Sequence, residues 1–269
     1  MLVIKNNIMA ANAARHLGQS YDALAKSVER LSSGLRINSA KDDAAGLAVR
    51  ELMRADIAVT QQGVRNAQDG ISMLQTMEGA LQTIDNALVR MKQLAEQAAT
   101  GSYSSAQRAI MDQEFAEMSN EIDRIATATK FNSIAMLDNS ASVSIHFGST
   151  NDFISVTGSN MTKSGLGINT LAIDTAASAK AALATLDTAI STKDTARAGF
   201  GYKMNRLEST VEVLNISAEN LATAESRVSD VDVATEMAAM TRNQVLAQAG
   251  ISMLTQANTM PQMALNLLR

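Results

Sequence analysis

The 269-residue sequence contains no cysteine, no tryptophan and only one proline, Pro261. Without cysteine, the chain has no disulfides, no thiol catalysis and no thiolate metal sites. Aromatic residues make up 3% of the chain, so Ala, Leu, Ile, Val and 16 Met must fill the interior. Side chains without rings, in a chain with almost no proline, favour long helices that pack side by side.

The sequence also lacks a basic surplus and long apolar runs. The net charge is −4 and the pI is about 5.3, so we expect no binding to nucleic acid. No segment approaches the ~18 consecutive apolar residues of a spanning helix. Lys5, Asn6 and Asn7 interrupt the apolar start of the chain. We therefore expect no membrane insertion, and if the protein leaves the cell we expect a route that cleaves no secretory signal.

Three segments carry apolar residues at alternating steps of three and four, which is typical of a helix with one apolar stripe. They cover residues 57–98, 111–125 and 176–232, and Gly101 follows the first. Each stripe needs a neighbouring helix to cover it. The pattern predicts a mainly α fold of long antiparallel helical rods, resembling a coiled-coil bundle. Charged residues interrupt the third stripe and are expected to weaken it locally, namely Lys193, Arg197 and Glu225.

The segment 139–175 has a different character. Apolar and polar residues alternate in 142–147 and again in 153–158, with Gly, Ser, Thr, Asn and Asp between them. This arrangement predicts a β-hairpin. Residues 159–175 are rich in Ser, Thr, Gly and Asn and indicate a loop or a weak strand. The insert is too small to be a domain and is expected to lie on the helices.

Both ends of the chain are apolar and nearly free of charge. Residues 1–14 contain one charged side chain, Lys5, and residues 243–268 contain none. Chain ends are normally solvated, so we expect these to become ordered only when they pack against something. The ends could pair within a monomer, lie on a membrane or assemble with other copies; the membrane reading lacks the expected Lys, Arg, Trp and Phe. Candidate polymerisation residues are Leu17, Leu24, Val28, Leu31, Ile251, Leu254, Leu265, Leu267 and Leu268.

A short segment between the first apolar stretch and the long helices is expected to be a linker. Gly34 permits an unusual backbone angle. Ser39 or Asp42 can cap the helix that follows, and Asp42 and Asp43 suit the positive end of its dipole. The linker candidates are Gly34, Arg36, Asn38, Asp42 and Asp43.

Catalytic and cofactor sites are not expected. His16 and His146 are the only histidines, and no cysteine accompanies them. The acidic pairs Asp42–Asp43 and Asp230–Asp232 stand at helix boundaries, where acids commonly serve as caps. We therefore predict a protein that is not an enzyme and has no cofactor and no metal.

Four local sequences carry a family resemblance. They are ERLSSGLRINSAKDDAAG (29–46), NAQDGISMLQTMEGAL (66–81), RVSDVDVATEM (227–237) and QANTMPQMALNLLR (256–269). In this order they resemble the two ends of bacterial flagellin, over residues 1–138 and 176–269. Only residues 139–175 stand where the family carries its outer domains, so the sequence resembles a minimal flagellin.

The resemblance implies a domain organisation. Residues 1–38 and 233–269 would form an inner terminal helical domain, the filament core. Residues 39–138 and 176–232 would form the helices of a rod domain, and 139–175 its hairpin and loop insert.

The resemblance also implies partners. These are copies of the same chain in a helical filament, an export chaperone on the C-terminal segment (233–269), the filament cap and the hook-junction proteins. The implied location is the extracellular filament, reached by flagellar type III export and serving swimming motility.

A receptor site is implied by the stretch RMKQLAEQ (90–97). It resembles the family segment that the animal innate-immune Toll-like receptor 5 recognises, and Arg90, Leu94 and Glu114 fall on the matching positions. The alternative is that these residues only pack subunits together. For the whole chain, the rival functions are a hook–filament junction protein and a membrane-active type III translocator.

Overall fold

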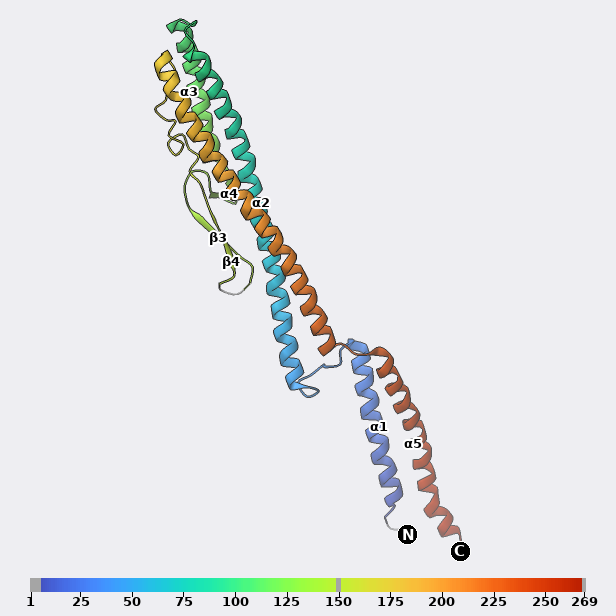
Figure 1. Ribbon diagram of the computed structural model, residues 1–269. Helices are drawn as coiled ribbons and strands as arrows, with labels where there is room; N and C mark the ends of the chain where they lie inside the picture. The colour runs from blue at the N-terminus through green and yellow to red at the C-terminus, as the bar shows by residue number, and fades with distance from the viewer. Residues whose placement is uncertain (1–5, 149–150, 268–269) are drawn as a thin grey trace. The chain divides into compact units, whose positions relative to one another are not determined.

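The computed structural model describes residues 6–148 and 151–267, and beyond residue 260 only the side chain of Met263 (Figure 1). Within these residues the chain forms five helices and two small hairpins, so the predicted mainly α fold is confirmed. The helices are α1 (Ile8–Ser33), α2 (Ala44–Ala99), α3 (Ser105–Ala128), α4 (Ala176–Ser229) and α5 (Val233–Leu267). The strands are β1 (Lys130–Phe131), β2 (Ile134–Ala135), β3 (Ser142–His146) and β4 (Phe153–Thr157).

The chain divides into two compact units. One contains residues 1–57 and 220–269, and the other contains residues 58–219. Residues 39–57 and 220–232, assigned to the rod from the sequence, therefore cluster with the terminal helices. The assignment of a filament-core domain and a rod domain stays a prediction.

Local side chains define where the helices begin and end. The Asn7 side chain accepts a hydrogen bond from the backbone N–H of Ala10 and caps α1, and Gly34 ends this helix with φ of 74°. Ser104 and Gln107 form a reciprocal capping box at the start of α3. At the start of α2 the capping side chain is Asp43, which accepts from Gly46 N–H at 2.8 Å. The expectation of Ser39 or Asp42 as this cap is wrong, because Asp42 turns back to Ser39 and accepts its backbone N–H at 3.2 Å.

The predicted apolar stripes form the core of the unit 58–219, where α2, α3 and α4 lie together (Figure 1). α2 and α4 are antiparallel, because Glu78 pairs with Arg197 while Lys92 pairs with Asp187. The members of the α2 stripe from Leu74 to Ala98 are fully buried, and so are most of those of α3. Core residues include Leu74, Met77, Leu81, Ile84, Leu88, Met91, Phe115, Ile122, Leu186 and Leu207.

The charged residues on the α4 stripe have partners on α2 or nearby. The Lys193 ammonium, 2% exposed, lies 2.5 Å from Asp85 and 2.6 Å from Asp194. Burial alone would lower the pKa of Lys193, but the hydrogen bonds to these two carboxylates outweigh it and raise the pKa above 10.5. Arg197 pairs with Glu78 at 3.2 Å. The prediction of a weakened stripe therefore overlooked the acids that face it from α2.

The predicted hairpin of β3 and β4 is confirmed, with Ser142 opposite Thr157 and His146 opposite Phe153. The hairpin lies on α2, where Gly63 and Gly70 have no side chain and so leave room for it. A Cβ atom on Gly63 would come within 2.2 Å of the Phe147 carbonyl oxygen. The Asn66 amide donates to the His146 carbonyl oxygen at 2.8 Å. Backbone contact of this kind holds a hairpin that could not persist alone.

The second hairpin, β1 and β2, has no counterpart in the sequence analysis. Its two turn residues, Asn132 and Ser133, both have positive φ, 47° and 66°. This is the geometry of a tight type I′ turn. The segment 159–175 is a loop, as expected, and it fills the core with four buried apolar residues: Met161, Leu166, Ile168 and Ile173.

Candidate functional site

The terminal helices α1 and α5 pack against each other in antiparallel fashion. The Asn7 amide donates to the Ala257 carbonyl oxygen at 2.7 Å near one end of the pair, and Arg30 lies 3.5 Å from Glu236 near the other. Gly250 lies against Leu17, since a Cβ atom there would come within 3.1 Å of the leucine side chain. Small residues on α5 thus let the two helices approach closely.

The α1–α5 pair leaves much of its apolar surface uncovered. Two helices with one stripe each bury only the sides that face each other. Residues more than 40% exposed include Ile8, Met9, Tyr21, Val28, Val233, Met237, Val245, Leu246, Ile251, Met253 and Met263. An open hollow on α5 is lined by Met237, Thr241, Arg242, Val245 and others. An exposed apolar surface of this extent is typical of a protein–protein interface.

The structure divides the candidate polymerisation residues into two groups. Val28 and Ile251 are exposed, at 50% and 47%. Half-buried between the helices are Leu17, Leu24, Leu31 and Leu254. Leu268 lies outside the described residues, and the side chains of Leu265 and Leu267 lie outside the described side chains.

The linker candidates join α1 to the end of α4 through the backbone. Leu35 and Asp230 form an isolated antiparallel bridge. The Arg36 guanidinium donates to the Val228 carbonyl oxygen at 2.7 Å, and the Asn38 amide donates to the Glu29 carbonyl oxygen at 3.4 Å. The linker therefore packs against α1 and against the end of α4.

Asp42 ties this linker to α1. Its carboxylate lies 2.7 Å from the Lys26 ammonium and also accepts from the Ser39 hydroxyl at 3.2 Å. The hydrogen bond from Lys26, followed by that from the Ser39 backbone, lowers the pKa of Asp42 to about 2. Asp42 is thus ionised throughout the physiological range and holds Lys26 and Ser39 together.

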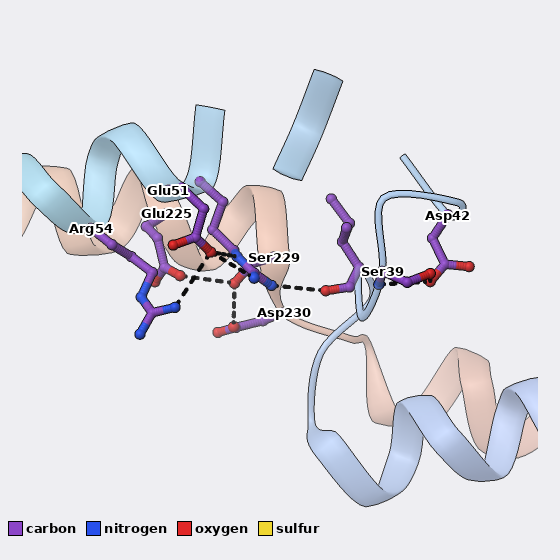
Figure 2. A network of polar contacts seen from close by, with 9 residues as sticks. Ser39, Asp42, Glu51, Arg54, Glu225, Ser229 and Asp230 are labelled. Carbon is purple, nitrogen blue, oxygen red and sulfur yellow. Dashed lines mark hydrogen bonds and ion pairs between the residues drawn. The ribbon is translucent and has the colours of Figure 1, made fainter. Parts of the chain in front are cut away.

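A buried arginine, Arg50, anchors the first turns of α2, where Glu51 and Arg54 lie beside each other (Figure 2). Arg50, 9% exposed, donates to the Ile37 carbonyl oxygen at 2.8 Å. Its other nitrogen atoms donate to the Glu51 carboxylate, which Arg54 also approaches at 3.4 Å. The hydrogen bond from Arg50 lowers the pKa of Glu51. Arg50 thereby satisfies a linker carbonyl that would otherwise be buried without a partner.

A second polar cluster lies at the end of α4 (Figure 2). The hydroxyl of the fully buried Ser229 lies within hydrogen-bond distance of two carboxylates that share its proton, at 3.2 Å from Glu225 and 3.1 Å from Asp230. Glu225, the third charged residue of the α4 stripe, therefore serves the end of its own helix. Sequence reasoning missed both Arg50 and Ser229, because their partners lie on linker backbone or at a helix end that no periodic pattern marks.

The receptor candidates lie on α2 and α3, and the structure brings two of them together. The Arg90 guanidinium lies 2.6 Å from the Glu114 carboxylate, with about half of each side chain exposed. Leu94 is 2% exposed and belongs to the apolar core between the helices. Arg90 and Glu114 are accessible on the surface of this unit, whereas Leu94 is not.

The described residues offer no metal site: no group of three His, Cys, Asp or Glu lies close enough together there. The His146 ring lies 5.1 Å from that of Phe153 and packs on the hairpin. Nor does any helix in the described part of the chain have the length and apolar character needed to cross a membrane.

Comparison with known proteins matches both halves of the helical framework. Residues 4–142 match the family described as the bacterial flagellin N-terminal helical region, and residues 183–268 match the bacterial flagellin C-terminal helical region. The chain belongs to the bacterial flagellin family. Flagellin is a family of structural proteins, not of enzymes.

Full-length relatives support the same assignment. The chain is 41% identical to the flagellar filament 33 kDa core protein of Treponema phagedenis and 40% identical to a flagellin of Halalkalibacterium halodurans. Both matches cover 100% of each chain. This flagellin is also 39% identical to that of Bacillus subtilis, over 99% of each chain.

Solved structures share the fold. The crystal structure of Bacillus cereus flagellin matches at 34% identity and a TM-score of 0.51, covering 60% of this flagellin and 94% of that chain. A putative flagellar hook-associated protein from Vibrio parahaemolyticus matches at 14% identity and a TM-score of 0.58, covering 70% and 100%. The second likeness concerns the fold alone.

Proposed function

We propose that this flagellin is the structural subunit of a bacterial flagellar filament, which it builds for swimming motility by polymerising through α1 and α5. The observation that supports this is the uncovered apolar surface of the α1–α5 pair. Burying the exposed part of one Leu, Ile, Val or Met side chain contributes about 1 kcal/mol. Neighbouring copies that cover many such side chains gain enough free energy to offset the translational and rotational freedom that the subunits lose on association.

The absence of charge strengthens the proposal. Residues 243–268 carry no charged side chain, so a neighbouring subunit can cover this part of α5 without desolvating an ion. The same segment would be a liability in a lone soluble protein. In this proposal 1–38 and 233–269 form the filament core, and 39–138 and 176–232 with the insert 139–175 form the rod around it.

The test is growth on filament seeds. Purified full-length chain is added to sonicated filament fragments, and polymer is measured by sedimentation and electron microscopy. A chain lacking residues 243–269 is expected to stay a helical monomer that no longer elongates the fragments. Ile251→Asp places a charge on the exposed face and is expected to slow elongation strongly, whereas the matched control Ile251→Met elongates normally. Normal filaments from the truncated chain would contradict the proposal.

Two rival functions predict other results. A hook–filament junction protein would add to fragment ends without growing into long polymers. A membrane-active translocator would release dye from liposomes, which we do not expect because α1 and α5 lack the basic polar face of such helices.

The proposal extends to partners and location. An unassembled subunit would need its C-terminal segment (233–269) covered, which is the task of an export chaperone. After type III export, the cap and the hook-junction proteins would meet the same apolar helices at the ends of an extracellular filament. Pull-down with residues 233–269, compared with residues 176–232, tests for a chaperone that binds the terminal segment.

We also propose, on the family resemblance, that the monomer is a ligand of Toll-like receptor 5. Arg90 and Glu114 are the residues whose exposure suits a direct contact. Leu94 would act by holding the helix in shape, since its side chain is buried. Arg90→Ala or Glu114→Ala should reduce receptor signalling by the monomer, whereas Glu117→Ala, at an exposed acid nearby on α3, should not. Equal signalling by all of these variants would contradict the receptor role.

A further inference from the structure

Methionine side chains are distributed unevenly between the two compact units. In the unit 58–219, six methionines are at most 8% exposed: Met73, Met77, Met91, Met111, Met136 and Met161. Among the described methionines, the four with the largest exposed fractions all lie on the terminal helices. Their exposed fractions are 63% for Met9, 47% for Met237, 61% for Met253 and 52% for Met263.

Exposure determines how fast a methionine reacts with peroxide. A lone pair of the thioether sulfur attacks one oxygen atom of hydrogen peroxide, so the S–O bond forms as the O–O bond breaks. Sulfur is oxidised by two electrons, and the second peroxide oxygen, reduced, leaves as water after taking up the proton of the first. A core methionine must wait for local opening of the fold before this reaction can occur. The four exposed methionine side chains require no such opening.

Oxidation changes what these helices can bury. A sulfoxide is polar and accepts hydrogen bonds, whereas the thioether is a flexible apolar group. Met237 lines the hollow on α5 beside Val245 and Leu246, and Met253 and Met263 lie in the segment without charged side chains. A sulfoxide covered by an apolar neighbour would be buried with few donors available, which is unfavourable.

We propose that Met9, Met237, Met253 and Met263 form a modification site at which peroxide oxidises the unassembled subunit and blocks its addition to the filament. This inference rests on the proposed function, because it assumes that the same faces of α1 and α5 are covered in the polymer. Sulfoxide reductases that act on the two sulfoxide epimers would reverse the block.

The experiment uses the full-length chain in unassembled form. The protein is treated with hydrogen peroxide, each methionine is scored by peptide mass mapping, and elongation of untreated filament fragments is then measured. We expect the four exposed methionines to oxidise before the six buried ones, with the helical circular dichroism unchanged. Elongation should fall about tenfold for each buried sulfoxide that finds no donor. Treatment with both reductases should restore it.

Two variants separate this site from general damage. The variant M9L/M237L/M253L/M263L keeps apolar side chains of similar volume and should elongate equally before and after peroxide. The matched control M77L/M91L changes two buried methionines and should lose elongation after peroxide as the unmodified chain does. Assembled filaments should oxidise more slowly at the four positions than free subunits.

The outcomes are distinguishable. If untreated protein does not elongate the fragments, the proposed function fails and the inference fails with it. If untreated protein elongates and the oxidised protein elongates equally well, the inference alone is overturned. It is also overturned if the four-leucine variant loses as much elongation after peroxide as the unmodified chain, or if the buried methionines oxidise first.

Discussion

The Lys193 ammonium lies 2.5 Å from the Asp85 carboxylate, inside the interface between α4 and α2. Lys193 is almost fully buried, while Asp85 keeps about a quarter of its side chain exposed. A buried ammonium is unfavourable unless carboxylates or other acceptors replace its lost hydration. Because Lys193 reaches Asp85 in only one alignment of the two helices, the pair defines their register.

Removing the two members of this pair should have unequal effects. Asp85→Ala leaves a buried ammonium with Asp194 as its remaining partner and should lower the free energy of unfolding by about 1–3 kcal/mol. Lys193→Met removes the buried charge, leaves a partly hydrated carboxylate, and should change this free energy by less than about 1 kcal/mol. Urea unfolding followed by circular dichroism measures both, with Lys180→Met as the exposed control. Equal losses for both variants would contradict this account.

Asp42 should titrate far below an ordinary aspartate. Its folded pKa of about 2 is below the usual 3.8, so the stabilisation it gives is complete above pH 3.8 and is lost as the pH falls towards 2. Carbon NMR of the Asp42 carboxyl group should show a midpoint near 2. In Lys26→Met, which removes the largest cause of the shift, the midpoint should move towards 3.8. A midpoint near 3.8 in the unmodified chain would show that the ion pair is absent.

Gly63 and Gly79 should respond oppositely to alanine. Both lie within α2, but a Cβ on Gly63 would collide with the backbone of Phe147, whereas a Cβ on Gly79 meets nothing within 4 Å. Gly63→Ala should destabilise the unit by about 1–3 kcal/mol and speed amide hydrogen exchange in β3 and β4. Gly79→Ala should stabilise it by about 0.5–1 kcal/mol through helix propensity. If Gly63→Ala is also stabilising, the hairpin does not rest on α2 as described.

Gly34 and Gly18 offer a second comparison, on α1. Gly34 ends the helix with φ of 74°, so Gly34→Ala should lower the free energy of unfolding by about 1–2 kcal/mol. Gly34→Asn should lower it less, because asparagine tolerates this conformation. Gly18→Ala, inside the helix and without neighbours within 4 Å, should raise it by about 0.5–1 kcal/mol. Thermal unfolding of the monomer ranks the three variants, and a harmless Gly34→Ala would argue against this cap.

The long helices and the main hairpin were predictable from the sequence because periodicity reports burial directly. Residues such as Leu81 and Phe115 fall on the expected stripes and are buried. The β1–β2 hairpin was not predictable in the same way, because each strand has only two residues, which is too short to show an alternation of apolar and polar side chains. Its turn is also unusual, because Ser133 adopts a positive φ that is rare for serine.

The polar contacts were harder to predict than the apolar ones. Lys193 looked like a defect in a stripe because its partner Asp85 is 108 positions away in the chain. Arg50 donates to a carbonyl group, and a backbone acceptor leaves no trace in a sequence. At the start of α2, Ser39, Asp42 and Asp43 are all of residue types that cap helices, and only the path of the linker selects Asp43. For the candidate site, the sequence identified the apolar chain ends, whereas which of their side chains stay exposed depends on how α1 and α5 pair.

The hydrogen bond from Asn7 to the Ala257 carbonyl joins positions 250 residues apart. A ribosome that adds about 5–20 residues per second makes these two positions roughly 10–50 s apart. Throughout that interval α1 is already synthesised while the helix that will cover one of its sides does not yet exist. Every nascent chain therefore exposes its first helix for almost the whole of translation, and a transcript broken before the codons of α5 yields a product whose first helix never acquires its partner.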